Sequence, residues 1–356
     1  MKNEVWFTDQ ERHEMTVPTL NKVAAMLEKA DYELAAKLCK GLKAEWGFLR
    51  ILMIDSIVEL LDYIEEKKGK EYKDKAGKKV FDKLWKTPAK GTMDSERKLV
   101  EKGIIEEWAK IGVNVKSRFI VSWLSKEYLN QMTYPKEEQK LFEYVSERDK
   151  KRAIESIKMA KHEWGIYHDL LVESIALLLT FISEECGEQD VGYALAEMTS
   201  KVWKEPFLQI QKRDQKTIAT ALAATWRAHS TYGAGPDPGS FEIYEDEDKL
   251  TFKLGPCGSG QRLWRMEHEN YGKTKGAYSW SFNRKDFPYY CAHCTYMNEL
   301  MPINWSGNPV YPLDPPSTPE KYCTWYFYKD PEGADKRFYE RYGIEKDKVS
   351  RGKDHV

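Results

Sequence analysis

The sequence predicts an α+β protein in which a duplicated all-α helical-bundle domain is followed by a small β-rich, cysteine-containing α+β domain. Three observations lead to this fold class. A long apolar segment with helical spacing occurs twice in the first two thirds of the chain. Strand-like alternation of apolar and polar residues begins only after the Gly/Pro-rich segment TYGAGPDPGS at 231–240. Four of the six cysteines also lie beyond that segment.

The repeated segment defines the helical part. EWGFLRILMIDSIVELLDYIEEKKG at 45–69 aligns without a gap to EWGIYHDLLVESIALLLTFISEECG at 163–187, and 11 of the 25 positions are identical at an offset of 118 residues. The same offset pairs Trp85 with Trp203. Because the apolar residues of both copies follow helical spacing, we expect a long helix in each. Both segments end in glycine, where a C-cap glycine belongs.

This register divides the chain into parts. A period of 118 residues is too long for a solenoid, so a duplicated domain describes the pattern better. We expect an N-terminal extension at 1–19, helical repeat A at 20–118, a connector at 119–137, helical repeat B at 138–234, a cysteine- and aromatic-rich, metal-binding α+β domain at 236–340, and a charged tail at 341–356.

The last domain contains two segments that predict β-structure. FEIYEDEDKLTFKLG at 241–255 alternates apolar and polar residues around an acidic turn, which is typical of a β-hairpin. KYCTWYFYKD at 321–330 predicts a further strand, and KRFYERYG at 336–343 predicts a short helix near the tail.

Composition excludes several classes of partner. The 56 basic and 57 acidic side chains give a formal net charge of −1, which leaves no electrostatic footprint for nucleic acid or an anionic membrane. The first 15 residues lack the apolar core of a secretory signal. The apolar stretch at 170–182 is interrupted by polar residues and is shorter than the roughly 20 residues of a membrane span. We therefore expect a cytoplasmic protein with a small-molecule ligand, and a homo-oligomer is compatible with the sequence.

The cysteines of the last domain predict a metal site. Cys291 and Cys294 have C-x-x-C spacing, and a loop of that length lets two thiolates reach one ion at about 2.3 Å from each sulfur. Cys257 lies in the glycine-rich turn GPCGSG, and Cys323 lies on a predicted strand. We expect four thiolates, or three with His293, to hold zinc. An iron–sulfur cluster is the second choice.

Other interpretations of these cysteines stay open. Cys257 and Cys323 could be ordinary buried small residues, and Cys291 with Cys294 could be a redox dithiol, although no βαβ pattern surrounds them. The loop GPCGSGQR could form an anion nest in which Cys257 is a nucleophile beside an oxyanion hole. Arg262 would then bind a carboxylate or phosphate.

The second copy of the repeat carries a candidate acid–base residue. His168 lies on the apolar stripe of its predicted helix, and the equivalent residue of the first copy is Arg50. Histidine titrates near neutral pH, so His168 is the best proton-transfer candidate of the helical part. Asp169 and Glu173, four residues apart, could support a proton relay or bind a cation, or could simply be solvated.

These residues together predict a cytoplasmic zinc-dependent enzyme that acts on a small anionic or aromatic molecule by hydrolytic or lyase chemistry. The catalytic candidates are His168, Asp169, Glu173, Cys257 and Arg262. One rival is a non-enzymatic binding protein with a closed, structural four-cysteine site. Another is a thiol enzyme that uses Cys257. The aromatic side chains of the last domain form either a ligand pocket or its core; they are Trp264, Trp280, Tyr289, Tyr290, Tyr296, Trp305, Trp325 and Tyr326.

Overall fold

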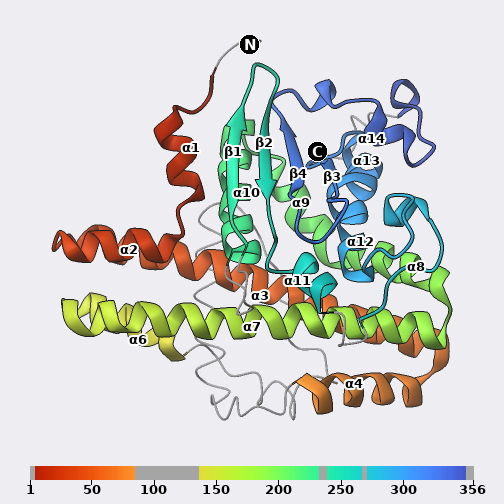
Figure 1. The fold of residues 1–356 in the computed structure, drawn as a ribbon, viewed down its shortest axis with the longest axis horizontal. Helices are drawn as coiled ribbons and strands as arrows, with labels where there is room; N and C mark the ends of the chain where they lie inside the picture. Colours follow the sequence, from red (N-terminus) through yellow and green to blue (C-terminus); the bar gives the residue numbers. More distant parts are fainter. Residues whose placement is uncertain (1–4, 85–135, 232–238, 267–270, 350–356) are drawn as a thin grey trace.

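The computed structural model describes residues 5–84, 136–231, 239–266 and 271–349. These residues form an α+β structure that is mostly helical and contains one four-stranded antiparallel sheet (Figure 1). Several predicted features lie outside the described residues. They are the part of repeat A from 85 to 118 with Trp85, the connector up to 135, the linker residues 232–238, and the end of the charged tail at 350–356.

Two long helices form the base of the molecule. They are α3 (Tyr32–Lys68) and α7 (Lys150–Glu185), which lie side by side and run in the same direction (Figure 1). A shorter helix precedes each of them and another follows. The preceding helices are α2 (Thr19–Glu28) and α6 (Lys136–Ser146), and the following ones are α4 (Lys70–Leu84) and α8 (Glu188–Met198).

The two long helices begin at residues that are 118 positions apart, and the glycines that follow them have the same offset. The carboxylates of Asp31 and Asp149 accept hydrogen bonds from the backbone three residues later, at 3.0 and 2.9 Å, and so cap the first turns. Beyond the last turns stand Gly69 and Gly187, with φ of 91° and 108°. Only glycine adopts such angles without strain, so both helices stop there.

A pair of equivalent tryptophans joins the long helices. The rings of Trp46 and Trp164 stack with centroids 5.3 Å apart and planes 8° apart, and both side chains are fully buried. The indole N–H of Trp164 also donates to the carbonyl of Ala228 at 2.9 Å. Buried aromatic pairs of this kind stabilise a contact beyond their area alone, so this stack fixes where α3 crosses α7.

The helix α7 is apolar enough, by length and composition alone, to cross a membrane. It is the one such helix among the described residues, and 78% of its most apolar window is buried inside the protein. The two helix positions Arg50 and His168, which are equivalent in the repeat, are both buried as well. Arg50 pairs with Glu138 of α6 at 3.2 Å, whereas His168 faces the C-terminal part of the chain.

The sheet has the strand order β1-β2-β4-β3 with every pair antiparallel. Its strands are β1 (Phe241–Glu245), β2 (Lys249–Leu254), β3 (Leu313–Asp314) and β4 (Cys323–Tyr328). The predicted hairpin and the predicted strand are therefore confirmed. Alternate side chains of β2 and β4 are buried, as a sheet with one covered face requires.

Short helices complete the described chain. Before the sheet come α1 (Asp9–Thr16), η1 (Thr199–Trp203), α9 (Lys204–Ile210) and α10 (Gln215–Ser230). Between β2 and β3 lie α11 (Gly260–Arg265), η3 (Ser279–Ser281), α12 (Tyr289–Thr295), η4 (Tyr296–Leu300) and α13 (Met301–Ser306). After β4 follow η5 (Pro331–Gly333), α14 (Arg337–Glu340) and η6 (Lys346–Lys348), so the helix predicted at 336–343 is present but shorter.

The hydrophobic cores cross the predicted boundary near residue 236. Tyr289 and Tyr290 of α12 belong to the same buried cluster as α3 and α7. In a second buried cluster, Trp226 of α10 packs on Phe252 and Trp325 of the sheet, with ring centroids 4.6 and 5.0 Å away. The helical part and the cysteine-bearing part therefore share their interiors, and side chains from both meet between them.

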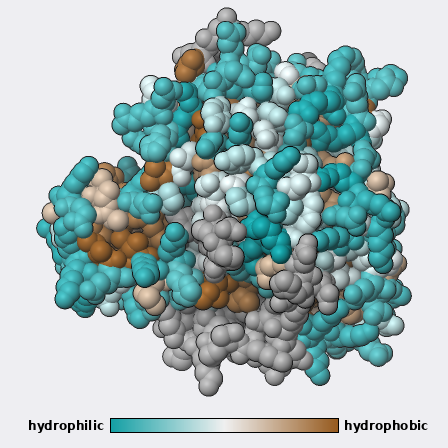
Figure 2. All heavy atoms as spheres, viewed as in Figure 1, coloured by the Kyte–Doolittle hydropathy of each residue, from teal (hydrophilic) through white to brown (hydrophobic). Residues whose placement is uncertain are grey.

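Hydrophilic side chains cover most of the face seen in Figure 2. Apolar side chains gather near the end of the molecule where α2 and α6 lie (Figures 1 and 2). Large apolar side chains of this helical part that are exposed include Leu34 and Met159, at 40% and 49%.

Candidate functional site

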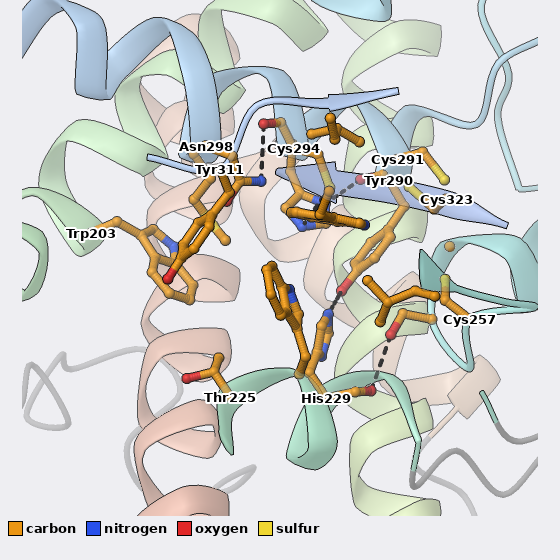
Figure 3. Close-up of a pocket in the computed structure, with 18 of the residues that line it drawn as sticks. Trp203, Thr225, His229, Cys257, Tyr290, Cys291, Cys294, Asn298, Tyr311 and Cys323 are labelled. Carbon is orange, nitrogen blue, oxygen red and sulfur yellow. Dashed lines mark hydrogen bonds between the residues drawn. The ribbon is translucent and has the colours of Figure 1, made fainter. Parts of the chain in front are cut away.

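A cavity of about 220 Å³ lies where the helical part meets the cysteine-bearing part (Figure 3). Its lining is mostly apolar, and no Lys, Arg, Asp or Glu is among the described residues that form it. The aromatic rings around it come from helices and sheet alike; they include Phe48, Trp203, Phe207, Trp226, Trp264, Phe287, Tyr290, Trp305, Tyr311 and Trp325. Of the predicted aromatic group, some members thus line a pocket, whereas Trp280, Tyr289 and Tyr296 are part of the core.

The four predicted cysteine ligands all line this cavity. Cys257 precedes α11, Cys291 and Cys294 lie on α12, and Cys323 begins β4. None of them forms a disulfide. In Figure 3, Cys291, Cys294 and Cys323 gather at the end of the cavity opposite His229. A β-carbon on Gly260 would overlap the sulfur of Cys291, so glycine is required for this approach.

The C-x-x-C pair lies on a helix, and the expected loop is wrong. Pro288 begins α12 at its N-cap, and the tyrosines after it bury their rings in the core. On a helix, residues three apart share one face. The thiols of Cys291 and Cys294 therefore still open toward the same cavity.

Burial keeps these thiols protonated. It raises the pKa of Cys291, Cys294 and Cys323 well above the usual value, and negative charge on the neighbouring cysteines would raise each pKa further. Burial also raises the pKa of Cys257, but backbone N–H groups oppose it. One of them, from Gln261, lies 3.4 Å from the sulfur. The sulfur of Cys257 thus has backbone hydrogen-bond donors that would stabilise a thiolate.

The described residues contain no group of three or more His, Cys, Asp or Glu side chains close enough to hold a metal ion. Zinc binds thiolate at about 2.3 Å. The four sulfurs have the right chemistry and face one cavity, yet they would have to turn toward one another to close around an ion.

His293 lies among these cysteines but is anchored to its own helix. Its Nδ1–H donates to the carbonyl of Tyr290. That bond leaves Nε2 as the acceptor nitrogen, and it lies 3.6 Å from the thiol of Cys294, which donates to it. Burial lowers the pKa of His293 to about 4, so the imidazole is neutral. A neutral imidazole with one acceptor nitrogen can serve as a ligand or as a base.

The other side of the cavity contains a buried chain of polar groups. His168 donates from Nδ1 to the carboxylate of Asp169 at 2.9 Å. The Nε2 atom of His168 lies 3.1 Å from Nδ1 of His229 and 3.1 Å from the hydroxyl of Ser259. His229 and Ser259 line the cavity, and Nε2 of His229 lies 3.4 Å from the hydroxyl of Tyr290. The chain thus runs from a buried carboxylate to the cavity wall.

One assignment of protons satisfies this chain. Tyr290 donates to His229, His229 donates from Nδ1 to His168, and His168 donates to Asp169. The hydroxyl of Ser259 then donates to the carbonyl of His229 at 3.2 Å. Each N–H and O–H is used once, which a buried network requires. Burial lowers the pKa of both imidazoles, so both are neutral and can accept a proton.

The remaining predicted residues, Arg262 and Glu173, lie at the Asp169 end of this chain. Arg262 is buried, and its guanidinium contacts Glu173 at 2.6 Å and Asp169 at 3.3 Å. Glu173 in turn accepts from the hydroxyl of Tyr271 at 2.8 Å. The four residues predicted as catalytic in addition to Cys257 are therefore brought together in one network. Arg262 is occupied by carboxylates of the protein itself, and it is not among the residues that line the cavity.

Sequence reasoning missed two residues of this site, His229 and Ser259, and it expected Tyr290 only as an aromatic residue of a pocket or core. Ser259 stands two residues after Cys257 in the glycine-rich loop that was singled out. A serine between two glycines lies in a tight turn that can expose its hydroxyl, and this pattern could have identified Ser259 as a candidate. His229 had none, because its partner His168 is 61 residues away in sequence and on another helix.

Comparison with known proteins gave no relative. No protein-family model, no curated protein and no solved structure matches this chain.

Proposed function

We propose that the protein is a cytoplasmic enzyme that binds a small, uncharged, largely aromatic molecule in the cavity and acts on it by hydrolytic or lyase chemistry. The observation that carries the proposal is the hydrogen-bonded chain from Asp169 through His168 to His229 at the cavity wall. A base within hydrogen-bond reach and oriented by a third group is the arrangement that general acid–base catalysis needs.

The charges of this network support its role as a proton acceptor. Its three charged side chains are Asp169, Glu173 and Arg262. Two carboxylates face one guanidinium, so one proton on the imidazole pair would make the network neutral. Because the cavity end of the chain is an imidazole with a lowered pKa, the pair is unprotonated at neutral pH and available as a base.

The lining of the cavity favours an uncharged, aromatic substrate. Burying a charged ligand without an oppositely charged partner is costly, and the described lining offers no charged side chain. Aromatic rings instead cover much of the wall, as in pockets for planar, apolar molecules. We therefore favour an aromatic substrate over the anionic one that the sequence also allowed.

As a second candidate, we propose that the cysteines of the cavity hold zinc. The observation that favours it is that Cys257, Cys291, Cys294 and Cys323, from three separate parts of the fold, face one cavity. With three protein ligands, including His293 as an option, zinc would keep a position for water and generate hydroxide. With four it would be structural, and an iron–sulfur cluster would use the same thiolates.

We also propose that the helical part arose by duplication. The support is the set of equivalent features 118 residues apart: the aspartate caps, the glycines with positive φ, and the stacked tryptophans. The backbone before each cap also matches, because Ala30 and Arg148 have left-handed φ of 58° and 59°.

The substrate class can be tested by ligand binding. Purified protein is screened with neutral and anionic aromatic compounds by thermal shift, and the compounds that bind are tested for turnover. We expect neutral compounds to raise the melting temperature. We expect His229→Gln to lose turnover, whereas His162→Gln, at an exposed position of α7, keeps it. Binding of anionic compounds alone, or full turnover by His229→Gln, would contradict the proposal.

The metal can be tested separately by elemental analysis of the purified chain. One equivalent of zinc that is lost from Cys294→Ser, but kept in Cys186→Ser, supports the second candidate. Cys186 is the matched control because it lies at the end of α7, outside the cavity lining. A folded and active protein without metal would remove zinc from the proposal and leave the acid–base chain in place.

A further inference from the structure

Ser259 stands at a helix start but does not act as a cap. It occupies the N-cap position of α11, and its hydroxyl makes no capping hydrogen bond. A serine at that position ordinarily accepts from the backbone of the first turn. Here the hydroxyl lies 3.1 Å from Nε2 of His168 and 3.2 Å from the carbonyl of His229. It is also part of the cavity lining.

The contacts of Ser259 match those of a nucleophilic serine. Such a serine needs a base within hydrogen-bond reach and a third group that orients the base. His168 supplies the base at 3.1 Å, and Asp169 orients it through a 2.9 Å hydrogen bond to Nδ1. The serine and the histidine are 91 residues apart in sequence, so the fold itself assembles the arrangement.

We propose that Ser259 is a covalent nucleophile activated by His168 and Asp169, and that the reaction is acyl transfer from a neutral aryl ester or amide. This inference rests on the proposed function and specifies its reaction class.

The steps balance without a cofactor. The hydroxyl proton of Ser259 passes to Nε2 of His168 while Oγ bonds to the carbonyl carbon. The bond to the alcohol or amine then breaks, and that group leaves with the proton from His168. Water attacks the resulting ester and gives its proton to His168. Oγ leaves with this proton, and the carboxylic acid is released.

His229 acts as a positioning residue in these steps. In the resting chain Nδ1–H of His229 donates to Nε2 of His168. These steps require the other tautomer of His229, with its proton on Nε2, so that Nε2 of His168 is open to Ser259 and the Nδ1 lone pair of His229 accepts the new N–H of protonated His168 across the 3.1 Å contact. The Nε2–H then points toward the hydroxyl of Tyr290. The imidazolium that forms at His168 is thus held by a carboxylate at one nitrogen and by an imidazole at the other.

The thiol expected from the sequence is less well placed for this role. The sulfur of Cys257 accepts a backbone N–H from Gln261. No imidazole in the described part of the chain hydrogen-bonds to it. Ser259 therefore has the base that Cys257 lacks.

A fluorophosphonate tests the proposal directly, because it phosphonylates activated serines with loss of fluoride. The full chain is incubated with the probe, and the modified peptide is identified by mass spectrometry. We expect one label per chain, on Ser259. The site of the label is read in the unmodified sequence, so the result does not depend on whether a variant folds. A label on another residue, or no label, overturns the proposal.

Variants then test the base. Ser259→Ala and His168→Gln should lose the label. Ser56→Ala should keep it, since Ser56 also lines the cavity but donates to the carbonyl of Leu52. Labelling of Ser259→Ala at the original rate would sink the inference.

The two proposals fail in different ways. If neutral aromatic compounds bind and turn over in Ser259→Ala but not in His229→Gln, only the nucleophile is wrong. If nothing aromatic binds to the unmodified protein, the proposed function itself fails.

Discussion

Glu299 makes stability depend on pH in a way that can be measured. Its side chain is fully buried on η4, just after the helix that bears Cys291 and Cys294. It accepts the backbone N–H of Leu313 at 2.8 Å and pairs with Arg341 at 3.3 Å. Burial nevertheless raises the pKa of Glu299 to about 7, from 4.5 for an unperturbed glutamate.

The magnitude follows from this difference in pKa. A difference of one in pKa corresponds to about 1.4 kcal/mol, so a rise from 4.5 to about 7 corresponds to about 3 kcal/mol. The folded pKa lies above the unfolded one. The stabilising contribution is therefore fully present below pH 4.5 and is lost as the pH rises through about 7. Glu299→Gln, which cannot ionise, should not show this loss.

The assay is urea unfolding of the unmodified protein and of Glu299→Gln at several pH values between 4.5 and about 8. The difference in unfolding free energy between them should shift by about 3 kcal/mol in favour of Glu299→Gln as the pH rises. Other titrating groups occur in both proteins and cancel. Glu340→Gln, an exposed change on α14, is the control. Parallel pH profiles for Glu299→Gln and the unmodified protein would refute the reasoning.

Three further predictions concern the scaffold and the acid–base chain. Trp46→Ala removes half of the buried stack and should lower the unfolding free energy by roughly 3–5 kcal/mol in urea, and a loss below 1 kcal/mol would contradict its structural role. Gly260→Ala should lower the unfolding free energy by roughly 1–3 kcal/mol, because its β-carbon would overlap Cys291. The control Gly41→Ala, on an open helix face, should raise it by about 0.5–1 kcal/mol. Equal effects of the two variants in thermal melts would argue against the overlap. Since burial lowers the pKa of His229, kcat/KM for a substrate identified in the screen should stay level through neutral pH and fall only below pH 6.5; an acid limb above that value would contradict the assignment.

The parts of the fold that follow from local pattern were predictable from sequence. The hairpin at 241–254 alternates with period two, and the long helices follow period 3.6, so both were identified from spacing. The C-x-x-C spacing predicted a loop, because such spacing is typical of metal-binding loops. The segment is a helix, and Pro288 just before it is a residue that favours a helix start.

The candidate site was predictable only in part, for a physical reason. His168 stood out because a polar residue on an apolar stripe must find a buried partner. Which partner it finds depends on how α7 packs against α10 and the loop before α11, and that packing is set by contacts far apart in sequence. The contacts to His229 and Ser259 were for this reason not accessible from spacing.

The positions of Arg50 and His168 have a consequence for how this chain can change. Both lie at equivalent places beside the tryptophan stack, yet Arg50 pairs with Glu138 of α6 in the other half of the helical part, while His168 contacts His229 of α10 and Ser259 in the loop before α11. One of the two equivalent positions thus joins the halves of the helical part, and the other joins the helical part to the cysteine-bearing part. A substitution of Arg50 should therefore change how α6 packs on α3, whereas a substitution of His168 should change the wall of the cavity, so the two equivalent positions can change independently.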